Sequence, residues 1–425
     1  MIMQDNEKKP ALRFKGFTDP WEQRKLDEAF DFTVPNNTFS RAELNQESGT
    51  VQNVHYGDIL IKYGSVLDVQ SDELPFITGR SKEDFRGALL QDGDIIIADT
   101  AEDETTGKVC EIVNIQDKDV VAGLHTMVCR PRNKTAEGYF GYYLNSNSYH
   151  HQLLPLMQGI KVLSLSRANV QKTTVKYPKD KAEQQKIADC LRSIDTLITL
   201  HQRKYEKLVN IKKSMLDKMF PKNGASVPEI RFKGFTDPWE QRKLEEYLEV
   251  SGQKNFDGIY SKEDVLSVSG DFGIVNQIEF QGRSFAGASV ANYGVVETGD
   301  IVYTKSPLKS NPYGIIKANK GKNGIVSTLY AVYKPKQSAN PEFVQIYFEQ
   351  DARMNNYMHP LVNKGAKNDM KVSAENALKG QIVFPDIEEQ RTISEFFRNL
   401  DTLITLHQRE HIKPILEVKR VKRNE

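Results

Sequence analysis

Apolar side chains recur along this chain with a helical spacing in one long central segment. Between residues 187 and 219 they return every three or four positions, as on one face of a long helix. The series is Ile187, Leu191, Ile194, Ile198, His201, Tyr205, Leu208, Lys212, Met215 and Met219, with His201 and Lys212 as polar exceptions. This spacing is typical of a coiled-coil seam. It predicts a helix of about 38 residues and about 57 Å, ending near Pro221.

A second stretch near the C-terminus has the same helical spacing. It carries Ile393, Phe397, Leu400, Ile404, His407 and His411. Acidic residues lie where both helices are expected to begin, Glu183 in the first and Glu388 in the second, and they suit the positive end of a helix dipole. Pro414 is expected to kink or end the second helix, and a basic tail follows it.

Ahead of each predicted helix lies a block of short segments rich in β-formers and separated by turn residues. These segments are 57–64, 94–98 and 126–130 in the first block, and 299–304, 313–317 and 329–333 in the second. Short helices are expected at 136–154 and 341–357. Each block therefore predicts a mixed, strand-rich domain.

The two blocks belong to an internal repeat. The sequence RFKGFTDPWEQRKL at 13–26 returns unchanged at 231–244, 218 residues later. The sequence DTLITLHQR at 195–203 returns at 401–409, 206 residues later, so the insert between these two markers is 12 residues longer in the first copy. The inserts hardly match, although both keep a Gly-Asp-Ile triplet, at 93–95 and 299–301. A fixed frame around divergent inserts indicates two recognition domains of common origin.

These patterns predict an α+β fold. Two mixed, strand-rich recognition domains stand in tandem, each followed by a long helix, with pseudo-two-fold symmetry between the copies. If the two helices packed antiparallel, they would hold the two domains apart and facing the same way. The expected boundaries are 1–180 for the first domain, 181–222 for the central helix, 223–387 for the second domain and 388–425 for the C-terminal helix.

Composition is consistent with two globular domains. The chain has 425 residues, which is too long for one ordinary core. Of these residues, 39% are hydrophobic and 27% are charged. The net charge is +1, so nucleic-acid binding would depend on local positive charge. One such run comprises Arg203, Lys204, Lys207, Lys212, Lys213, Lys218 and Lys222. A solvated helix face explains that run equally well.

Localisation is expected to be cytoplasmic. No apolar run has the roughly 18 residues that a membrane span requires. The first ten residues are polar and lack the apolar region of a secretory signal. Cys110, Cys129 and Cys190 are odd in number and scattered, which fits a reducing compartment and argues against a disulfide framework or a cysteine-rich metal site.

No catalytic or metal-binding constellation is predicted. His407 and His411 match the H-x-x-E-H peptidase pattern, but they lie on the predicted helix, and the first copy has Tyr205 where the second has His411. The segment Asn311-Pro312-Tyr313 lacks one proline of the N-P-P-Y motif of adenine methyltransferases, and no glycine-rich cofactor loop precedes it. An enzyme acting alone is therefore disfavoured.

Taken together, these segments resemble the specificity subunit of type I restriction–modification systems. The resemblance rests on the duplicated RFKGFTDPWEQRKL frame, on the two Gly-Asp-Ile triplets, and on the segments 177–187 and 384–393. It covers nearly the whole chain, and it implies that the two long helices pair antiparallel. It implies a non-catalytic subunit in which each target-recognition domain reads one half of a bipartite double-stranded DNA sequence. The length of the helices would set the spacer between the halves.

The resemblance also implies partners. Two modification subunits, which methylate adenine with S-adenosylmethionine, would dock on the helices. Two restriction subunits, which use ATP and Mg²⁺, would add translocation and cleavage, while this chain binds no cofactor itself. A phage anti-restriction protein that mimics DNA is a further expected partner, and no membrane is implied. The alternative is a stand-alone tandem-domain DNA-binding regulator or adaptor.

The loop before the last strand of each domain is the best candidate for phosphate contacts, because glycine allows close approach and Lys, Ser and Asn supply donors. The candidates are Lys161, Ser164, Ser166 and Arg167 in the first copy and Lys364, Lys367, Asn368 and Lys371 in the second. Base-edge readers are expected at strand ends and loops. The candidates are Lys62, Thr78, Arg80, Thr100, His125, Arg283, Lys305, Lys309 and Asn311. An ordinary exposed position is the alternative for each.

Overall fold

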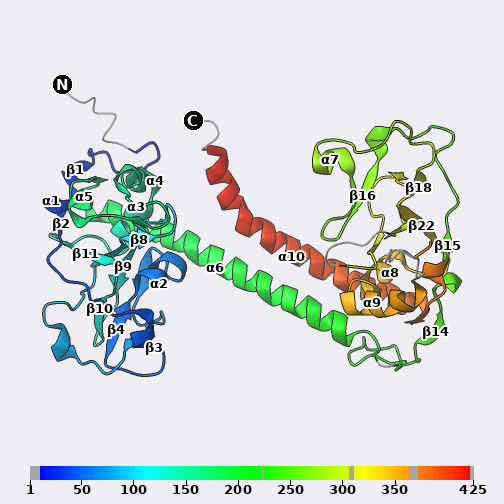
Figure 1. The fold of residues 1–425 in the computed structure, drawn as a ribbon, viewed down its shortest axis with the longest axis horizontal. Helices are drawn as coiled ribbons and strands as arrows, with labels where there is room; N and C mark the ends of the chain where they lie inside the picture. Colours follow the sequence, from blue (N-terminus) through cyan, green and yellow to red (C-terminus); the bar gives the residue numbers. More distant parts are fainter. Residues whose placement is uncertain (1–9, 223, 306–310, 363–371, 422–425) are drawn as a thin grey trace. The chain divides into compact units, whose positions relative to one another are not determined.

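The computed structural model of this chain describes residues 10–222, 224–305, 311–362 and 372–421, and of 409–421 it describes the backbone alone (Figure 1). The chain divides into two compact units, Met1–Leu197 and Ile198–Glu425. The long helix α6 (Lys181–Lys218) begins in the first unit and ends in the second.

The first unit is built on a mixed sheet with the strand order β2-β11-β7-β9-β5. Its strands are β2 (Phe30–Asp31), β11 (Thr126–Pro131), β7 (Ile95–Ala98), β9 (Val109–Val113) and β5 (Val66–Asp68). A second sheet has the order β10-β4-β6-β3, with β10 (Asp119–Ala122), β4 (Val51–Val54), β6 (Phe76–Ile77) and β3 (Leu44–Asn45). Two further pairs are β1 (Glu22–Lys25) with β13 (Thr174–Tyr177), and β8 (Thr100–Ala101) with β12 (Leu163–Ser164).

Short helices complete the first unit. They are α1 (Leu26–Ala29), α2 (Tyr56–Ile61), α3 (Tyr139–Asn145), α4 (Asn147–His150) and α5 (Arg167–Gln171), with 3₁₀ turns η2 (Arg41–Glu43), η3 (Lys82–Phe85) and η4 (Leu154–Leu156). One core packs α3 and α4 against β7, β9 and β11, and a second lies on the other face of that sheet under α2.

The second unit repeats the central part of this plan. Its main sheet has the order β15-β22-β19-β20, with β15 (Leu248–Val250), β22 (Tyr330–Pro335), β19 (Ile301–Thr304) and β20 (Ile316–Ala318). This order corresponds to β2-β11-β7-β9 of the first unit. The pair β14 (Glu240–Lys243) and β23 (Gln381–Phe384) corresponds to β1 and β13. The expectation that the two inserts share a fold is therefore confirmed.

The remaining elements of the second unit surround that sheet. They are β16 (Leu266–Ser269) paired with β17 (Gly273–Asn276), β18 (Gly294–Val296) paired with β21 (Gly324–Val326), α7 (Gln277–Gln281), α8 (Pro341–Tyr347), α9 (Asp351–Met358), η5 (Leu244–Glu246), η6 (Lys262–Asp264), η7 (His359–Leu361), η8 (Asn376–Leu378) and α10 (Ile387–Val421).

One predicted strand is wrong. Residues 57–64 were expected to be a strand because of their apolar run, but 56–61 form α2. The imidazole of His55 accepts a hydrogen bond from Gly57 N at 3.1 Å and so caps this helix. Ile59 is fully buried, whereas Ile61 is exposed, as one face of a surface helix requires. Pro414 does not end the C-terminal helix, since α10 continues past it to Val421.

An ion pair ties the repeated frame to the helix of its own copy. Arg13 donates two hydrogen bonds to the Glu183 carboxylate, at 2.6 and 2.7 Å, and Arg231 does the same to Glu389, at 2.8 and 2.7 Å. Both carboxylates are almost fully buried, with 1% of each side chain exposed. Bidentate geometry and burial make such pairs strong and specific. We refer to these two pairs as the frame clamps.

The helices that carry the clamps begin with matched caps. Asp180 accepts from Ala182 N at 2.8 Å, and Asp386 accepts from Glu388 N and Glu389 N at 2.9 Å. Gln184, which follows the clamp residue Glu183 in α6, accepts a hydrogen bond from Ala136 N and donates one to Pro178 O. Gln390 in α10 accepts from Asn340 N and donates to Pro385 O. The Glu-Gln pair of each copy thus joins the helix start to both the frame and the recognition domain.

Within the second unit, the end of α6 runs antiparallel to α10. Lys212 Nζ lies 2.7 Å from a carboxylate oxygen of Asp401, and His201 Nδ1 lies 2.9 Å from His407 Nδ1. The numbering rises along one helix as it falls along the other, which confirms the predicted antiparallel pairing. His201 and His407 hold the same place in the repeated DTLITLHQR sequence. Their contact therefore gives these helical segments a local two-fold relation.

A buried carboxylate holds the start of α3 in the first unit. Glu111 on β9 accepts from Gly138 N at 2.7 Å and from Gly141 N at 2.9 Å. Burial raises its pKa from the ordinary value of 4.5 to about 7, against the opposing effect of these two N–H groups. The folded first unit therefore keeps a proton on Glu111 at a pH where the unfolded chain has released it.

The frame clamp predicts a large effect of one substitution. Arg13→Met leaves the Glu183 carboxylate buried without its charge partner, so the free energy of unfolding of the first unit should fall by about 3 kcal/mol. The chain has two tryptophans, so a Trp239→Phe background reports on the first unit through Trp21 fluorescence during urea unfolding. Lys15→Met, at an exposed frame position, should change this free energy by less than about 0.5 kcal/mol. Equal effects of the two variants would contradict the clamp.

Glu111 predicts a pH dependence of stability. The folded state binds the proton more tightly, so the unfolding free energy of the first unit should fall as pH rises from 4.5 to about 7, and stay level above that range. The loss is on the order of 3 kcal/mol. Urea unfolding at pH 5, 6, 7 and 8 measures it, as the difference between wild type and Glu111→Gln. The exposed Glu102 of the same unit is the control, because Glu102→Gln should keep the wild-type slope.

Candidate nucleic-acid interface

The loop predicted to meet phosphate in the first unit forms a tight, exposed turn. Gln158 and Ser164 exchange backbone hydrogen bonds at 2.9 and 2.8 Å, and Lys161 lies exposed between them. Gly159 has a φ of +125°, and a Cβ there would lie 1.9 Å from Val162 O, so the turn requires glycine. Ser164 on β12 pairs with Thr100 on β8, so this turn lies beside the segment that follows β7 of the main sheet.

Several candidates come together beside that turn. Thr100 Oγ1 lies 3.4 Å from His125 Nδ1, and the His125 ring packs edge-on to Tyr56 with centroids 5.3 Å apart. His125 adopts a left-handed conformation, with a φ of +52°. Its side chain is 48% exposed and lies 3.6 Å from an Asp99 oxygen. Hydroxyl, imidazole and phenol groups at one place can donate to phosphate or to base edges.

An arginine extends this group of residues. Arg41 donates to both oxygens of Asp58, at 2.9 and 2.8 Å, and lies 3.3 Å from His55 Nδ1. His55 and Tyr56 are ring neighbours, 4.7 Å between centroids, which continues the chain of contacts to His125. Burial, and then the charge of Arg41, lower the pKa of His55. We call Arg41, Tyr56, Thr100, His125 and Ser164 the Arg41–Ser164 surface.

A second feature lies at the edge of the smaller sheet. The Arg80 guanidinium lies over the Phe39 ring at 5.2 Å, a cation–π arrangement. Both residues, with Asn36, Asn37 and Arg86, line a cavity of about 420 Å³. Thr78 lies nearby in the chain and accepts from Asn45 Nδ2 at 3.1 Å. An arginine positioned over an aromatic ring can offer two donors to guanine, the bidentate contact by which arginine recognises this base.

Three candidates of the first unit serve its own fold. Ser166 caps α5 by accepting from Asn169 N at 3.3 Å, and Arg167 donates to Phe32 O at 3.1 Å. Lys62 donates to Glu73 O at 2.7 Å. Among the described contacts, none joins Lys62 to the Arg41–Ser164 surface. DNA contact at these three positions stays a prediction, as it does for the others.

The second unit is described only in part at the matching places. Lys309, Lys364, Lys367, Asn368 and Lys371 lie outside the described residues. Lys305 is half-buried, and burial followed by the charge of Lys254 lowers its pKa. Arg283 lies over the Phe285 ring at 4.5 Å, and Asn311 donates to Asp351 at 2.5 Å.

The two units differ in charge at one equivalent position. Asp99 follows β7, and Lys305 follows β19, at the offset of 206 that relates the Gly-Asp-Ile triplets. Sequence reasoning selected Lys305 but missed the residues that contact His125, namely Tyr56 and, through His55, Arg41. The segment Asn36-Asn37-Thr38-Phe39-Ser40-Arg41 was a usable signal, since it joins amides, an aromatic ring and an arginine in one loop.

The parts of the chain that the structure describes contain neither a metal site nor a membrane span. There, no three His, Cys, Asp or Glu side chains come together as ligands for a metal ion would. No helix within the described ranges combines the length and the apolar character that crossing a bilayer requires.

Comparisons with known proteins bear on the family. Residues 18–210 match the family model of the type I restriction modification DNA specificity domain. A putative type I restriction enzyme specificity subunit, MjaX, of Methanocaldococcus jannaschii is 23% identical over 415 residues, which span 92% of this chain and 89% of the relative.

A solved structure extends the comparison to the fold of the whole chain. The crystal structure of the S subunit of a type I restriction–modification system from M. genitalium matches with a TM-score of 0.55 at 14% identity, over 97% of each chain. At this identity the similarity establishes the fold alone. The family match lies in the first copy, and the second copy repeats both its frame and its sheet order. Residues 18–210 therefore match the type I restriction modification DNA specificity domain, and the whole chain is similar in sequence to a putative specificity subunit.

Proposed function

We propose that this chain is the non-catalytic DNA specificity subunit of a type I restriction–modification complex. Each unit reads one half of a bipartite double-stranded DNA target. The observation that carries the proposal is the pair of equivalent sheets, each clamped to its own long helix by the same arginine–glutamate pair while the outer surfaces differ. Two recognition domains that share a frame but differ in their surfaces can bind two different half-sites, as an asymmetric DNA target requires.

The proposed division of the chain follows from its elements. The recognition domains comprise 1–180 and 223–387, and the helical segments comprise 181–222 and 388–425. Half-sites about 34–36 Å apart present the same face of a duplex. A helix of 38 residues, the length of α6, spans about 57 Å and can carry that separation. The helices therefore set the spacer and dock two modification subunits.

The wider assembly follows from the same proposal. The modification subunits use S-adenosylmethionine to methylate adenine, and two restriction subunits use ATP and Mg²⁺ for translocation and cleavage, in the cytoplasm. Phosphate-binding surfaces such as the turn around Lys161 would also accept a DNA-mimicking anti-restriction protein. A stand-alone regulator with no methyltransferase partner is the competing function, and no specific observation favours it.

Methylome sequencing tests the proposal. Expression of this chain together with the modification subunit of its own system, in a host that lacks both, should create one bipartite N6-methyladenine motif. Neither protein alone should create it. The absence of new methylation, with both proteins folded and associated, would favour the regulator instead.

The spacer is expected to follow the length of the helices. Four residues inserted in α6 after Gln202 add about 6 Å of helix, which equals nearly two base pairs at about 3.4 Å each. The methylated motif should keep both half-sites and gain spacer length. The same-length variant Gln202→Ala should leave the motif unchanged. A constant spacer in the lengthened variant would exclude the helix as a ruler.

Arg80 is expected to contribute to one half-site. Arg80→Ala removes the guanidinium that lies on Phe39, so the affinity of the complex for its methylation target should fall by about 1–3 kcal/mol. Discrimination at one base pair of one half-site should relax with it. Arg132→Ala, at an exposed arginine that donates to Asp27 O, is the matched control and should bind as wild type. Gel-shift titrations with target and single-mismatch duplexes measure both variants.

A further inference from the structure

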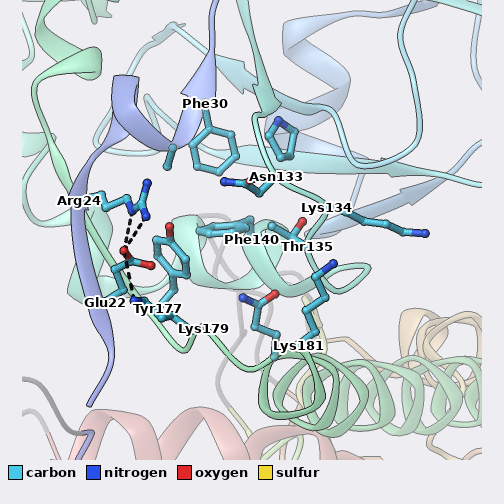
Figure 2. A pocket seen from close by; sticks show the side chains of 13 residues that line it. Glu22, Arg24, Phe30, Asn133, Lys134, Thr135, Phe140, Tyr177, Lys179 and Lys181 are labelled. Carbon is cyan, nitrogen blue, oxygen red and sulfur yellow. Dashed lines mark hydrogen bonds and ion pairs between the residues drawn. The ribbon is translucent and has the colours of Figure 1, made fainter. Parts of the chain in front are cut away.

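A cavity of about 280 Å³ opens in the first unit between the frame and the start of α6 (Figure 2). Its apolar wall is formed by Ala29, Phe30 and Pro131 together with the rings of Phe140 and Tyr177. Phe140 packs against Phe30 with centroids 4.9 Å apart and against Tyr177 at 5.3 Å. An apolar cavity of roughly 150 Å³ is enough to hold a benzene ring.

The rim of this cavity is cationic. Figure 2 shows Arg24, Lys134, Lys179 and Lys181 around it, with Glu22 as the acidic member. Glu22 is engaged by Arg24 at 2.7 Å, and Lys179 Nζ lies 3.9 Å away. Lys134, Lys179 and Lys181 are exposed. The rim therefore offers positive charge to an anionic ligand, over an aromatic wall.

The second copy fills the equivalent space with its own side chain. Arg132 N donates to Ala29 O at 2.9 Å, and Lys336 N donates to Tyr247 O at 2.8 Å, so Tyr247 holds the place of Ala29. Strand pairing places Glu22 opposite Tyr177 and Glu240 opposite Phe384, so Phe384 holds the place of Tyr177. The Tyr247 ring lies 4.9 Å from the Phe384 ring, and the residue is 5% exposed.

The positive charge around this space is also lower in the second copy, where Tyr247 occupies it. Ser338 replaces Lys134, in the same register as Lys336 and Arg132. Ile387 replaces Lys181 as the first residue of the long helix after its aspartate cap. Lys179 is an additional residue between the proline and the cap of the first copy. The copy that fills the space with a tyrosine thus lacks the lysines that surround the open cavity.

We propose that this cavity of the first unit binds an aromatic side chain, as Tyr247 does within the second unit, supplied by an acidic segment of another protein. The aromatic ring lies against Tyr177 and Phe140, and flanking carboxylates of the segment meet Lys134, Lys179 and Lys181. None of the residues that line this cavity belongs to the Arg41–Ser164 surface.

Peptide binding to the full chain tests this proposal. The probe is a fluorescently labelled acetyl-Asp-Glu-Tyr-Asp-Glu-amide, followed by anisotropy. A second peptide with Ser in place of Tyr has the same charge but no ring, and should bind at least tenfold more weakly. Binding of both peptides with equal affinity would mean that charge alone attracts them, which would overturn the proposal.

Substitutions with residues of the second copy locate the site. Ala29→Tyr places a ring in the cavity and should weaken peptide binding at least tenfold. Lys134→Ser combined with Lys181→Ile removes two exposed cations, and should weaken binding about three- to tenfold at low salt, with a smaller effect at high salt. This second variant decides the matter if Ala29→Tyr fails to fold, as judged by circular dichroism. Wild-type affinity in the folded variants would overturn the proposal.

A single-stranded oligonucleotide is the competing ligand, because it also combines rings with negative charge. A labelled oligothymidine of ten nucleotides should bind wild type and Ala29→Tyr equally. If Ala29→Tyr abolished oligonucleotide binding and left peptide binding unchanged, the cavity would be a nucleic-acid site and the proposal would be wrong. Methylation by the assembled complex is read separately, so failure here leaves the proposed function untouched.

Discussion

The buried pair between the frame arginine and the helix glutamate is the contact on which each half of this protein depends. Arg13 and Glu183, and again Arg231 and Glu389, join a segment at the start of a recognition domain to the helix that leaves it. A buried charge without its partner is costly, so both segments must be in place together. The pair therefore closes a loop of about 160–170 residues, inside which the recognition surface can change without loosening the junction.

The polar residues on the helix seam have a corresponding role. His201 and Lys212 interrupt an otherwise apolar spacing, and both make contacts between helices in the second unit. Lys212 also lies 2.5 Å from Glu349 near α9, so it links the helix pair to the recognition domain. Polar groups at a seam fix register, because any other alignment leaves them buried without partners. A ruler between two DNA readers requires such a fixed register.

The two copies diverge where the frame permits it. Asp99 and Lys305 place opposite charges after equivalent strands, and Ala29 and Tyr247 leave one cavity open and the other filled. The tryptophan of the repeated frame also has different neighbours in the two copies. Trp21 donates to Glu183 at 3.3 Å, whereas Trp239, in the same frame, packs between Phe220 and Phe343 at 5.9 Å from each. The frame has the same sequence in both copies, but its packing depends on the segments of the protein that surround it.

The sequence alone determined the repeat and the order of domain and helix, because these depend on exact recurrence and on the period of apolar residues. It misassigned 57–64 as a strand, although 56–61 form a helix, since a short apolar run is compatible with both states until the cap by His55 is known. The candidate surface was predicted in pieces. Ser164 and His125 were chosen separately, and only the tertiary structure brought them together through Thr100. The cavity beside Ala29 was not predictable from sequence, because its walls come from segments more than 100 residues apart, and burial is a property of packing.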